Sequence, residues 1–165
     1  VIRVTTTEEM VDAVVSELKG NKYDVFISTA AVLDYGPEKK YDTKLPSGLT
    51  DLVIKLKPLP KVVNAAREAD PHVFIVGFKA EYNVPEEVLI ERAYEKLVKS
   101  GMDLIVANDV GKERRGFESE TNEVFIIDRN KNIVHVPLKT KREVAREILN
   151  IIAEKLKERG IIRAD

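Results

Sequence analysis

Apolar residues follow two patterns, which alternate along this chain. Segments with apolar residues at every third or fourth position predict helices, and short, nearly continuous apolar runs predict strands. The predicted helices are residues 6–20, 62–69, 85–100 and 140–156, and the predicted strands are residues 1–5, 25–29, 72–78, 103–107, 124–128 and 133–137. This order predicts an α/β fold, a Rossmann-like, doubly wound and mostly parallel sheet that ends in a hairpin and a helix.

Residues at the helix ends support these boundaries. Thr6 and Glu9 have the spacing of a capping box, and Gly20 is suited to ending the first helix. Pro85 suits the first turn of the third helix, and Thr140 can cap the last one. The predicted buried face of that last helix consists of Val144, Ala145, Ile148, Leu149, Ile152 and Leu156.

The segment between the second strand and the second helix has a different character. Residues 36–48 contain two prolines, two glycines and three lysines, and they are too long for an ordinary connection. In the following stretch, alternation places Leu52, Ile54 and Leu56 on one face of an exposed edge strand. Such an edge needs covering, by the protein itself or by a second copy. We therefore predict a loop and dimerisation arm over residues 36–60.

Composition narrows the class of protein. The 165 residues have the length of one domain, so we predict a single domain over 1–165. The net charge is -1, there is no cysteine, and no apolar run approaches the length of a membrane span. No signal peptide is recognisable. We expect a cytoplasmic protein that binds neither nucleic acid nor membrane.

Distinctive residues follow three of the predicted buried strands. Phe26 to Tyr35 runs from apolar residues through small ones to the carboxylate of Asp34, Phe78 ends a second run, and Asn108 and Asp109 follow a third. Carboxyl ends of parallel strands meet at one edge of a sheet, where open α/β folds bind ligands. We predict a ligand crevice there. The alternative is an ordinary polar turn after each strand.

Three lysines lie where they can reach this crevice. Lys44 is in the long loop, and Lys96 and Lys99 are in the last turns of the third helix, so they can meet phosphates. The alternative is that Lys44 is solvated and that the other two complement the helix dipole. No G-x-G-x-x-G follows a strand, which argues against a dinucleotide site. His72 and His135 are isolated, so core or surface roles suit them better than metal binding.

Taken in order, several short motifs resemble the phosphopantothenate–cysteine ligase family of bacteria and archaea, commonly the C-terminal half of a bifunctional coenzyme A biosynthesis protein. The similarity extends from Val1 to about Leu156. The matching motifs are AAVLDY from Ala30, KLPSG from Lys44, IKLKPLPKVV from Ile54, VGFKAE from Val76, KLVKSGMDLIVANDV from Lys96, and GFES with TNEVFIID from Gly116.

The resemblance implies a ligase, independent of the ATP-grasp fold, that joins phosphopantothenate to cysteine. The carboxylate of phosphopantothenate would attack the α-phosphate of CTP, giving an acyl-cytidylate, and the cysteine amine would displace CMP. It implies Mg²⁺ as cofactor and a homodimer. A flavin is expected only if a phosphopantothenoylcysteine decarboxylase domain is fused upstream, and that decarboxylase is the other partner expected.

The resemblance also assigns roles to residues. Lys44 and Asn108 match catalytic positions, and Asp34 matches the acid near the ribose or metal. Lys96 matches a triphosphate lysine, and Lys99 lies next to Ser100, where the family has a second one. The remaining CTP-binding positions carried over are Ser28, Thr29, Ala30, Pro60, Lys61, Val62, Val63 and Phe78.

Besides having Ser100 in place of a lysine, this chain departs from the family in three respects. Pro46 stands where the family often has a second loop lysine, and Lys61 stands where it commonly has aspartate. We also expect the chain to lack the family's upstream strand–helix segment. The alternatives are therefore an inactive nucleotide-binding and dimerisation fragment of that enzyme and, more remotely, a nicotinamide-binding Rossmann oxidoreductase.

Overall fold

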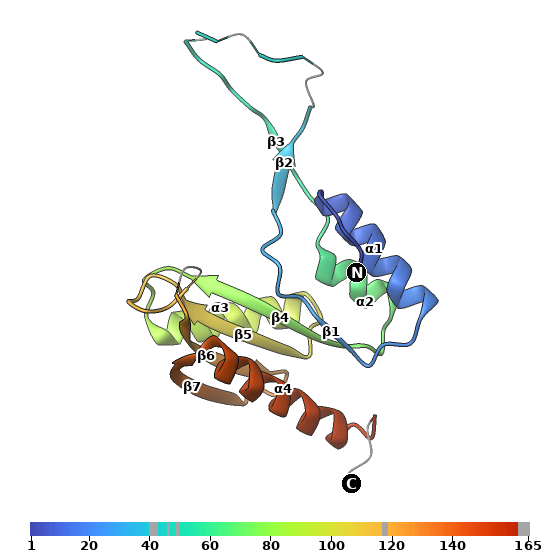
Figure 1. Ribbon diagram of the computed structural model, residues 1–165, viewed down its shortest axis with the longest axis vertical. Coiled ribbons are helices and arrows are strands. Elements are labelled where there is room, and N and C mark those ends of the chain that lie inside the picture. Colours follow the sequence, from blue (N-terminus) through green and yellow to red (C-terminus); the bar gives the residue numbers. More distant parts are fainter. Residues whose placement is uncertain (40–42, 46, 49, 117–118, 162–165) are drawn as a thin grey trace.

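The protein forms a five-stranded sheet with helices on both faces (Figure 1). The computed structural model describes residues 1–161 except 40–42, 46, 49 and 117–118. Three strands run parallel, and an antiparallel hairpin completes the sheet. In spatial order the strands are β1 (Val25–Ile27), β4 (Phe74–Glu81), β5 (Leu104–Asp109), β6 (Thr121–Asp128) and β7 (Ile133–Thr140). The predicted α/β fold is confirmed.

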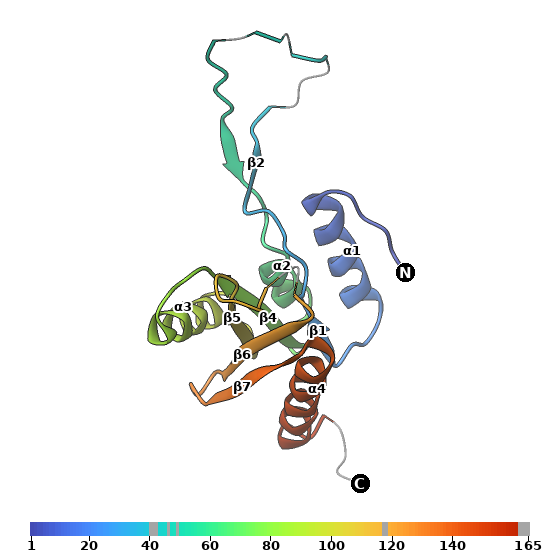
Figure 2. The same ribbon diagram turned by 60° about the vertical axis from the view of Figure 1, so that its left-hand side comes forward.

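Alternating residues of the strands feed two separate cores. Ile75 and Ile105 face one core, which is covered by α1 (Thr7–Gly20), α2 (Val62–Ala69) and α3 (Glu86–Lys99). Phe74 and Leu104 face the other, which is covered by α4 (Lys141–Glu158). Figure 2 shows α3 and α4 on opposite sides of the sheet. The central strands are buried on both faces, which explains their continuous apolar runs.

The predicted helix boundaries agree closely with the structure because their signals are local. Capping boxes begin two helices: Thr6 accepts from the amide of Glu9, and Thr140 accepts from the amide of Glu143. Pro85 is the N-cap of α3, one position before its first turn. The predicted buried face of α4 is partly wrong: Ala145 and Leu149 are exposed. Their positions turn them away from the sheet, against which Val144, Ile148, Ile152 and Leu156 are buried.

A two-stranded arm projects from the rest of the molecule (Figure 1). β2 (Tyr35–Pro37) pairs antiparallel with β3 (Leu56–Pro58), as part of the segment in which we predicted an arm. The predicted strand over residues 52–57 is too long, because pairing extends only over Leu56–Pro58. The four apolar side chains on this part of the arm are exposed: Leu52, Val53, Ile54 and Leu56.

The predicted strand over residues 1–5 is wrong. These residues have no strand pairing in the structure, and Val1, Ile2 and Val4 are exposed. The sequence has the composition of a strand here, but none of the described strands pairs with these residues. The predicted strand at 25–29 is also shorter, ending at Ile27. By contrast, β5 is longer than predicted, so Asn108 and Asp109 are its last residues.

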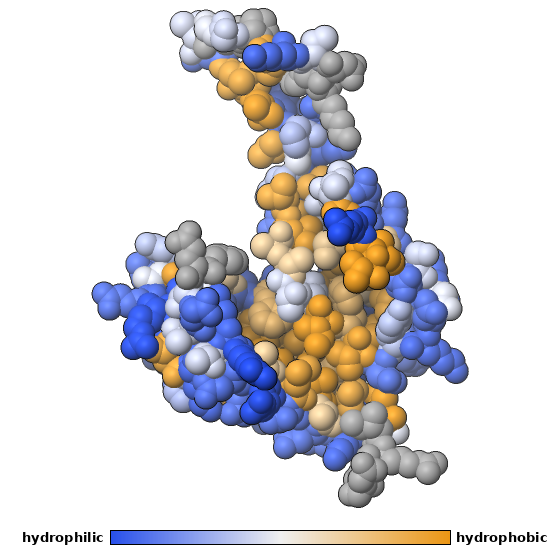
Figure 3. Space-filling view, viewed as in Figure 1, coloured by the Kyte–Doolittle hydropathy of each residue, from blue (hydrophilic) through white to orange (hydrophobic). Residues whose placement is uncertain are grey.

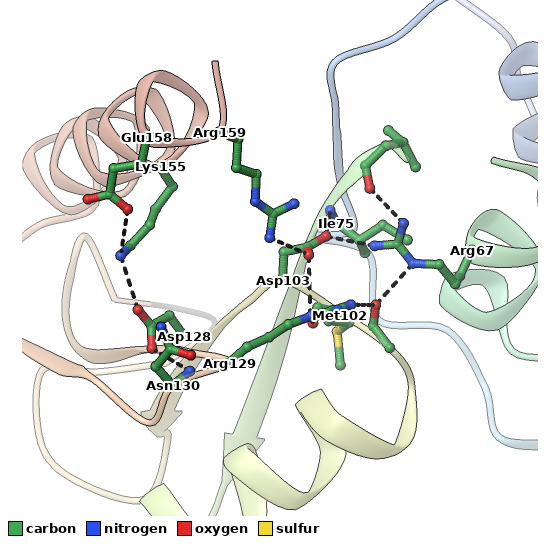
Figure 4. A network of polar contacts seen from close by, with 12 residues as sticks. Arg67, Ile75, Met102, Asp103, Asp128, Arg129, Asn130, Lys155, Glu158 and Arg159 are labelled. Atoms are coloured by element: carbon green, nitrogen blue, oxygen red, sulfur yellow. Dashed lines mark hydrogen bonds and ion pairs between the residues drawn. The ribbon is translucent and has the colours of Figure 1, made fainter. Parts of the chain in front are cut away.

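One buried carboxylate joins several elements at the amino ends of the central strands (Figure 4). Asp103, immediately before β5, accepts hydrogen bonds from the Ile75 amide at 2.8 Å and from Arg67 at 2.6 Å. Arg159, after α4, bonds its other oxygen at 2.8 Å, and Arg129 in the hairpin turn lies 3.3 Å from that oxygen. This network fastens both helix layers to the edge opposite the predicted crevice.

Candidate functional site

A cleft of about 640 Å³ opens at the carboxyl ends of the parallel strands. The segments that form it are the residues after β1, the turn into α2, the end of β4, the last turns of α3 and the end of β5. The cleft is lined by twelve of the thirteen predicted site residues: Ser28, Thr29, Ala30, Asp34, Pro60, Lys61, Val62, Val63, Phe78, Lys96, Lys99 and Asn108.

Lys44 is the exception. It is exposed and does not line the cleft. It lies in the segment beyond β2, on the arm that Figure 1 shows projecting from the sheet. Pro46, the departure from the family noted above, lies outside the described residues. The structure therefore does not bring Lys44 together with the other predicted residues within one chain.

The segment after β1 lies along one wall of the cleft with its backbone accessible. The amide of Ser28 still continues the sheet, donating to the Val76 carbonyl at 2.9 Å. Beyond it, Thr29 and Ala30 are exposed and have small side chains, so a planar group can approach the main chain closely. Asp34 ends this segment and forms an ion pair with Lys61. That pair links the end of the β1 segment to the start of α2.

The amino end of α2 also faces the cleft. Lys61 is its N-cap, and the Lys61 side chain accepts no capping hydrogen bond from the first turn. Val62, Val63 and Asn64, the first helical residues, line the cleft. Free amides at a helix N-terminus favour anions, since they carry the positive end of the helix dipole.

Lysines from three elements converge on the same side of the cleft. Lys61 precedes α2, Lys79 is on β4, and Lys96 is on α3. The ammonium group of Lys96 donates to the Phe78 carbonyl at 3.1 Å. Desolvation lowers the pKa of Lys96, the charges of Lys79 and Lys61 lower it further, and Asp34 opposes them. The hydrogen bond from Lys61 and the charges of all three lysines lower the pKa of Asp34, despite some desolvation.

The opposite side of the cleft is made of amide groups and one aromatic ring. Phe78 packs toward the core under α4, since it alternates with Lys79 along β4. Asn108 donates to the side-chain oxygen of Asn122 at 3.4 Å, across the β5–β6 pair. Lys141, the first residue of α4, also lines the cleft. The cleft thus wraps around the sheet edge, with three lysines on the α2 and α3 side and two amides, an aromatic ring and Lys141 on the other.

Besides Ser100, which was noted above only as the position of a second family lysine, sequence reasoning missed four polar residues of the cleft. Two of them had a signal: Lys79 directly follows Phe78 in the VGFKAE motif, and Lys141 follows the helix cap. Asn64 and Asn122 had none, because their positions depend on how α2 and β6 pack against the sheet.

Asp109 holds two segments near the rim of the cleft in place by hydrogen bonds. It is buried and accepts hydrogen bonds from the amides of Asn83 at 2.8 Å, Val84 at 3.2 Å and Gly111 at 2.9 Å. Burial alone would raise the pKa of Asp109, but the three amides outweigh it and lower the pKa. One carboxylate therefore fixes both the loop after β4 and the turn after β5, next to Asn108.

In the described part of the chain, His, Cys, Asp and Glu form no cluster of three or more that could hold a metal. A magnesium ion carried by a nucleotide does not need one, because it is usually held by one or two carboxylates together with phosphates. Asp34 is the carboxylate that lines the cleft. None of the described helices combines the length and apolar character that a bilayer crossing requires.

This chain resembles known proteins at the levels of family and sequence. A family model described as "DNA/pantothenate metabolism flavoprotein C-terminal domain" matches residues 1–156. The coenzyme A biosynthesis bifunctional protein CoaBC of Thermococcus kodakarensis is 43% identical over 155 residues, covering 94% of this chain and 37% of that protein. The chain thus spans little more than a third of the curated relatives it matches.

Two solved structures share the fold. A crystal structure of the C-terminal domain of coenzyme A biosynthesis bifunctional protein CoaBC matches with a TM-score of 0.72 at 30% identity, covering 95% of this chain and 68% of that one. The DNA/pantothenate metabolism flavoprotein from Streptococcus pneumoniae matches with a TM-score of 0.77 at 24% identity, covering 92% and 71%. At that identity the second comparison bears on the fold alone.

Proposed function

The chain belongs to the family of the DNA/pantothenate metabolism flavoprotein C-terminal domain, a family of coenzyme A biosynthesis, and from that membership we propose that it is a CTP-dependent phosphopantothenate–cysteine ligase. One observation carries the proposal beyond the family. Lys61, Lys79 and Lys96 converge in a single cleft beside the accessible backbone of residues 28–30. Such an arrangement suits a nucleotide, with its base on the backbone and its phosphates on the cations.

In this proposal each wall of the cleft has a task. Residues 28–30 and 60–63 hold the cytosine and ribose, and Lys96 and Lys99 hold phosphates. The reaction forms a bond between a substrate carboxylate and the α-phosphate with loss of pyrophosphate, and then an amide with loss of CMP. Neither step requires a protein nucleophile. The chain supplies positioning and positive charge where phosphate charge develops.

Asp34 is the residue that would hold Mg²⁺ together with the phosphates, and the ion would neutralise charge on the leaving pyrophosphate. Asn108, at the end of β5, can donate a hydrogen bond to the acid substrate or to the acyl intermediate. Its amide is oriented by Asn122, whose own oxygen also accepts from the amide of Glu123 at 3.1 Å.

We also propose that the protein forms a homodimer through the arm. The supporting observation is the set of exposed apolar side chains there, of which Val53 is 79% exposed and Leu56 59% (Figure 3). A second copy is the occupant proposed for this surface, because paired arms would bury both sets at once. The same pairing offers Lys44 a route to the cleft of the other copy.

The test is isothermal titration of this chain with CTP and Mg²⁺, with ATP and NAD as comparisons. We expect CTP to bind in the micromolar range and NAD not to bind. Absence of nucleotide binding would refute the proposal. Binding of NAD instead would favour the nicotinamide-dependent alternative.

A second candidate function is nucleotide binding without turnover, and the position of Lys44 outside the cleft favours it. Pyrophosphate release from CTP, with phosphopantothenate and cysteine, separates the two. It should be measured on this chain and on the complete gene product. Turnover by the chain alone would exclude the binding-only alternative.

A further inference from the structure

We propose that Lys79 is a phosphate-binding residue of the cleft, and that it leaves Glu81 to contact the nucleotide when the nucleotide binds. The inference rests on the proposed function and extends it. Neither the motifs nor the family roles assign a task to this residue.

The strand geometry places Lys79 on the correct side of the sheet. Residues of β4 alternate between faces, and Gly77 lies against Met102 in the core under α2 and α3. Lys79 and Glu81 therefore face the same side, as the ion pair between Glu81 and Arg92 of α3 confirms. Lys96 approaches from α3 on that side. Lys79 thus stands beside the residue already expected to hold phosphate.

Glu81, the present partner of Lys79, has a second cationic partner. Glu81 bonds Lys79 at 2.9 Å and Arg92 at 3.1 Å, so one carboxylate serves two cations. If Lys79 turns toward a ligand, Arg92 still neutralises Glu81. Since the Lys79 side chain is 29% exposed, breaking its pair costs little compared with breaking a buried one.

The charges of the cleft favour that movement once a polyanion is present. Lys61, Lys79 and Lys96, together with Arg92, face the carboxylates of Asp34 and Glu81, which leaves an excess of positive charge. The pKa of Lys96 is lowered by desolvation and by the charge of Lys79, so the lysines repel one another in the absence of ligand. A triphosphate would relieve this repulsion. A neutral nucleoside would not.

The first test replaces the charge and keeps the aliphatic stem, as Lys79→Met. We expect the affinity for CTP with Mg²⁺, measured by titration calorimetry, to fall about 10- to 100-fold. Affinity for cytidine, which has no phosphate, should be unchanged. The matched control is Lys19→Met, an exposed lysine of α1 away from the cleft, which should bind CTP as the wild type does.

The second test addresses the exchange of partners. Arg92→Met leaves Lys79 as the partner of Glu81, so Lys79 should leave Glu81 less readily and the affinity for CTP should fall severalfold. In a protein that already carries Lys79→Met, adding Arg92→Met should cause no further loss of CTP affinity. If wild type and Lys79→Met bind CTP equally, Lys79 has no such role. If Lys79→Met weakens cytidine and CTP alike, the residue is structural and the inference is wrong. If the wild type itself binds no nucleotide, the proposed function fails and this inference with it.

Discussion

At the scale of single residues, buried carboxylates organise the two edges of the sheet. Asp103 fixes the amino edge through three arginines and one amide, and Asp109 fixes the loops at the carboxyl edge through three amides. The side chain of Asp103 is 2% exposed. A carboxylate so buried is stable only while its partners remain.

Replacement of Asp103 by alanine should therefore destabilise the fold strongly. The change leaves Arg67, whose side chain is 21% exposed, without its carboxylate partner. We expect a loss of roughly 3 kcal/mol in the free energy of unfolding, because removing one member of a buried ion pair strands the other. Urea denaturation at pH 7 measures it. The control, Asp12→Ala on the exposed face of α1, should change stability by less than about 0.5 kcal/mol; equal effects would contradict the prediction.

Asp109 should make the free energy of unfolding depend on pH in the acid range. Its pKa is lowered in the folded state because three amide hydrogen bonds outweigh burial. The unfolded chain therefore binds the proton more tightly than the folded one. The stabilisation that Asp109 provides is therefore complete at pH values above about 3.9, the ordinary pKa of an aspartate side chain. It is lost as the pH falls through the lower pKa of the folded state.

Asp109→Asn removes this titration. The difference in unfolding free energy between wild type and variant should therefore be largest near neutral pH and shrink below about pH 4. Urea denaturation at several pH values between 7 and 3 measures the difference. A difference that stays constant over this range would show that Asp109 does not titrate as described. Asp12→Asn, on an exposed helix face, serves as the control.

At the scale of elements, the packing of β4 depends on a residue without a side chain. A Cβ at Gly77 would lie 2.1 Å from the sulfur of Met102, which is itself fully buried. The loop between α3 and β5 therefore rests directly on the backbone of β4. This close approach also keeps the floor of the cleft open, because Gly77 and Met102 both line it.

Gly77→Ala should consequently destabilise the protein by about 1–3 kcal/mol, the usual effect of overpacking a core. Gly20→Ala is the matched control. Gly20 is the last residue of α1 and has no atom within 4 Å of the added Cβ, so this change should be neutral or slightly stabilising. Thermal unfolding of both variants measures the contrast. A neutral Gly77→Ala would mean that Met102 moves aside freely.

At the scale of the whole molecule, the arm and the cleft are separate features of one chain. The arm carries exposed apolar residues away from the core (Figure 3). The cleft carries its lysines at the sheet edge. If the arm pairs with that of a second copy, its apolar side chains contribute to association and not to the fold of the core.

Leu52→Ser, Ile54→Ser and Leu56→Ser in one variant should therefore shift the protein from dimer to monomer in sedimentation equilibrium. The melting temperature of a concentrated sample should fall only by the contribution of dimerisation. Leu149→Ser on α4 is the control, since that leucine is 56% exposed but not on the arm. It should leave the dimer intact. A monomeric wild type would contradict the proposed arm interface.

The sequence alone determined the features whose signals are local. Helical spacing predicted α1, α2, α3 and α4. The capping box of Thr6 and Glu9 and the cap at Thr140 predicted where α1 and α4 begin, because a cap and its amide lie within one turn of each other. The rule that parallel strands end at one edge predicted that Asp34, Phe78 and Asn108 lie at one cleft, as they do in the structure. Residues 60–63, which also line the cleft, were assigned to it only by the family resemblance. That rule depends on strand order and direction, which the alternation of helices and strands already implies.

Only the tertiary structure decided the features that depend on register and docking between distant segments. The pair of Asp34 with Lys61 joins residues 27 positions apart, and the convergence of Lys79 with Lys96 requires α3 to dock over β4. Residues 1–5 have the composition of a strand but pair with none of the strands in the described part of the chain. Lys44 lies on the arm rather than in the cleft. In each case the energy comes from a partner far along the chain, which the local pattern does not specify.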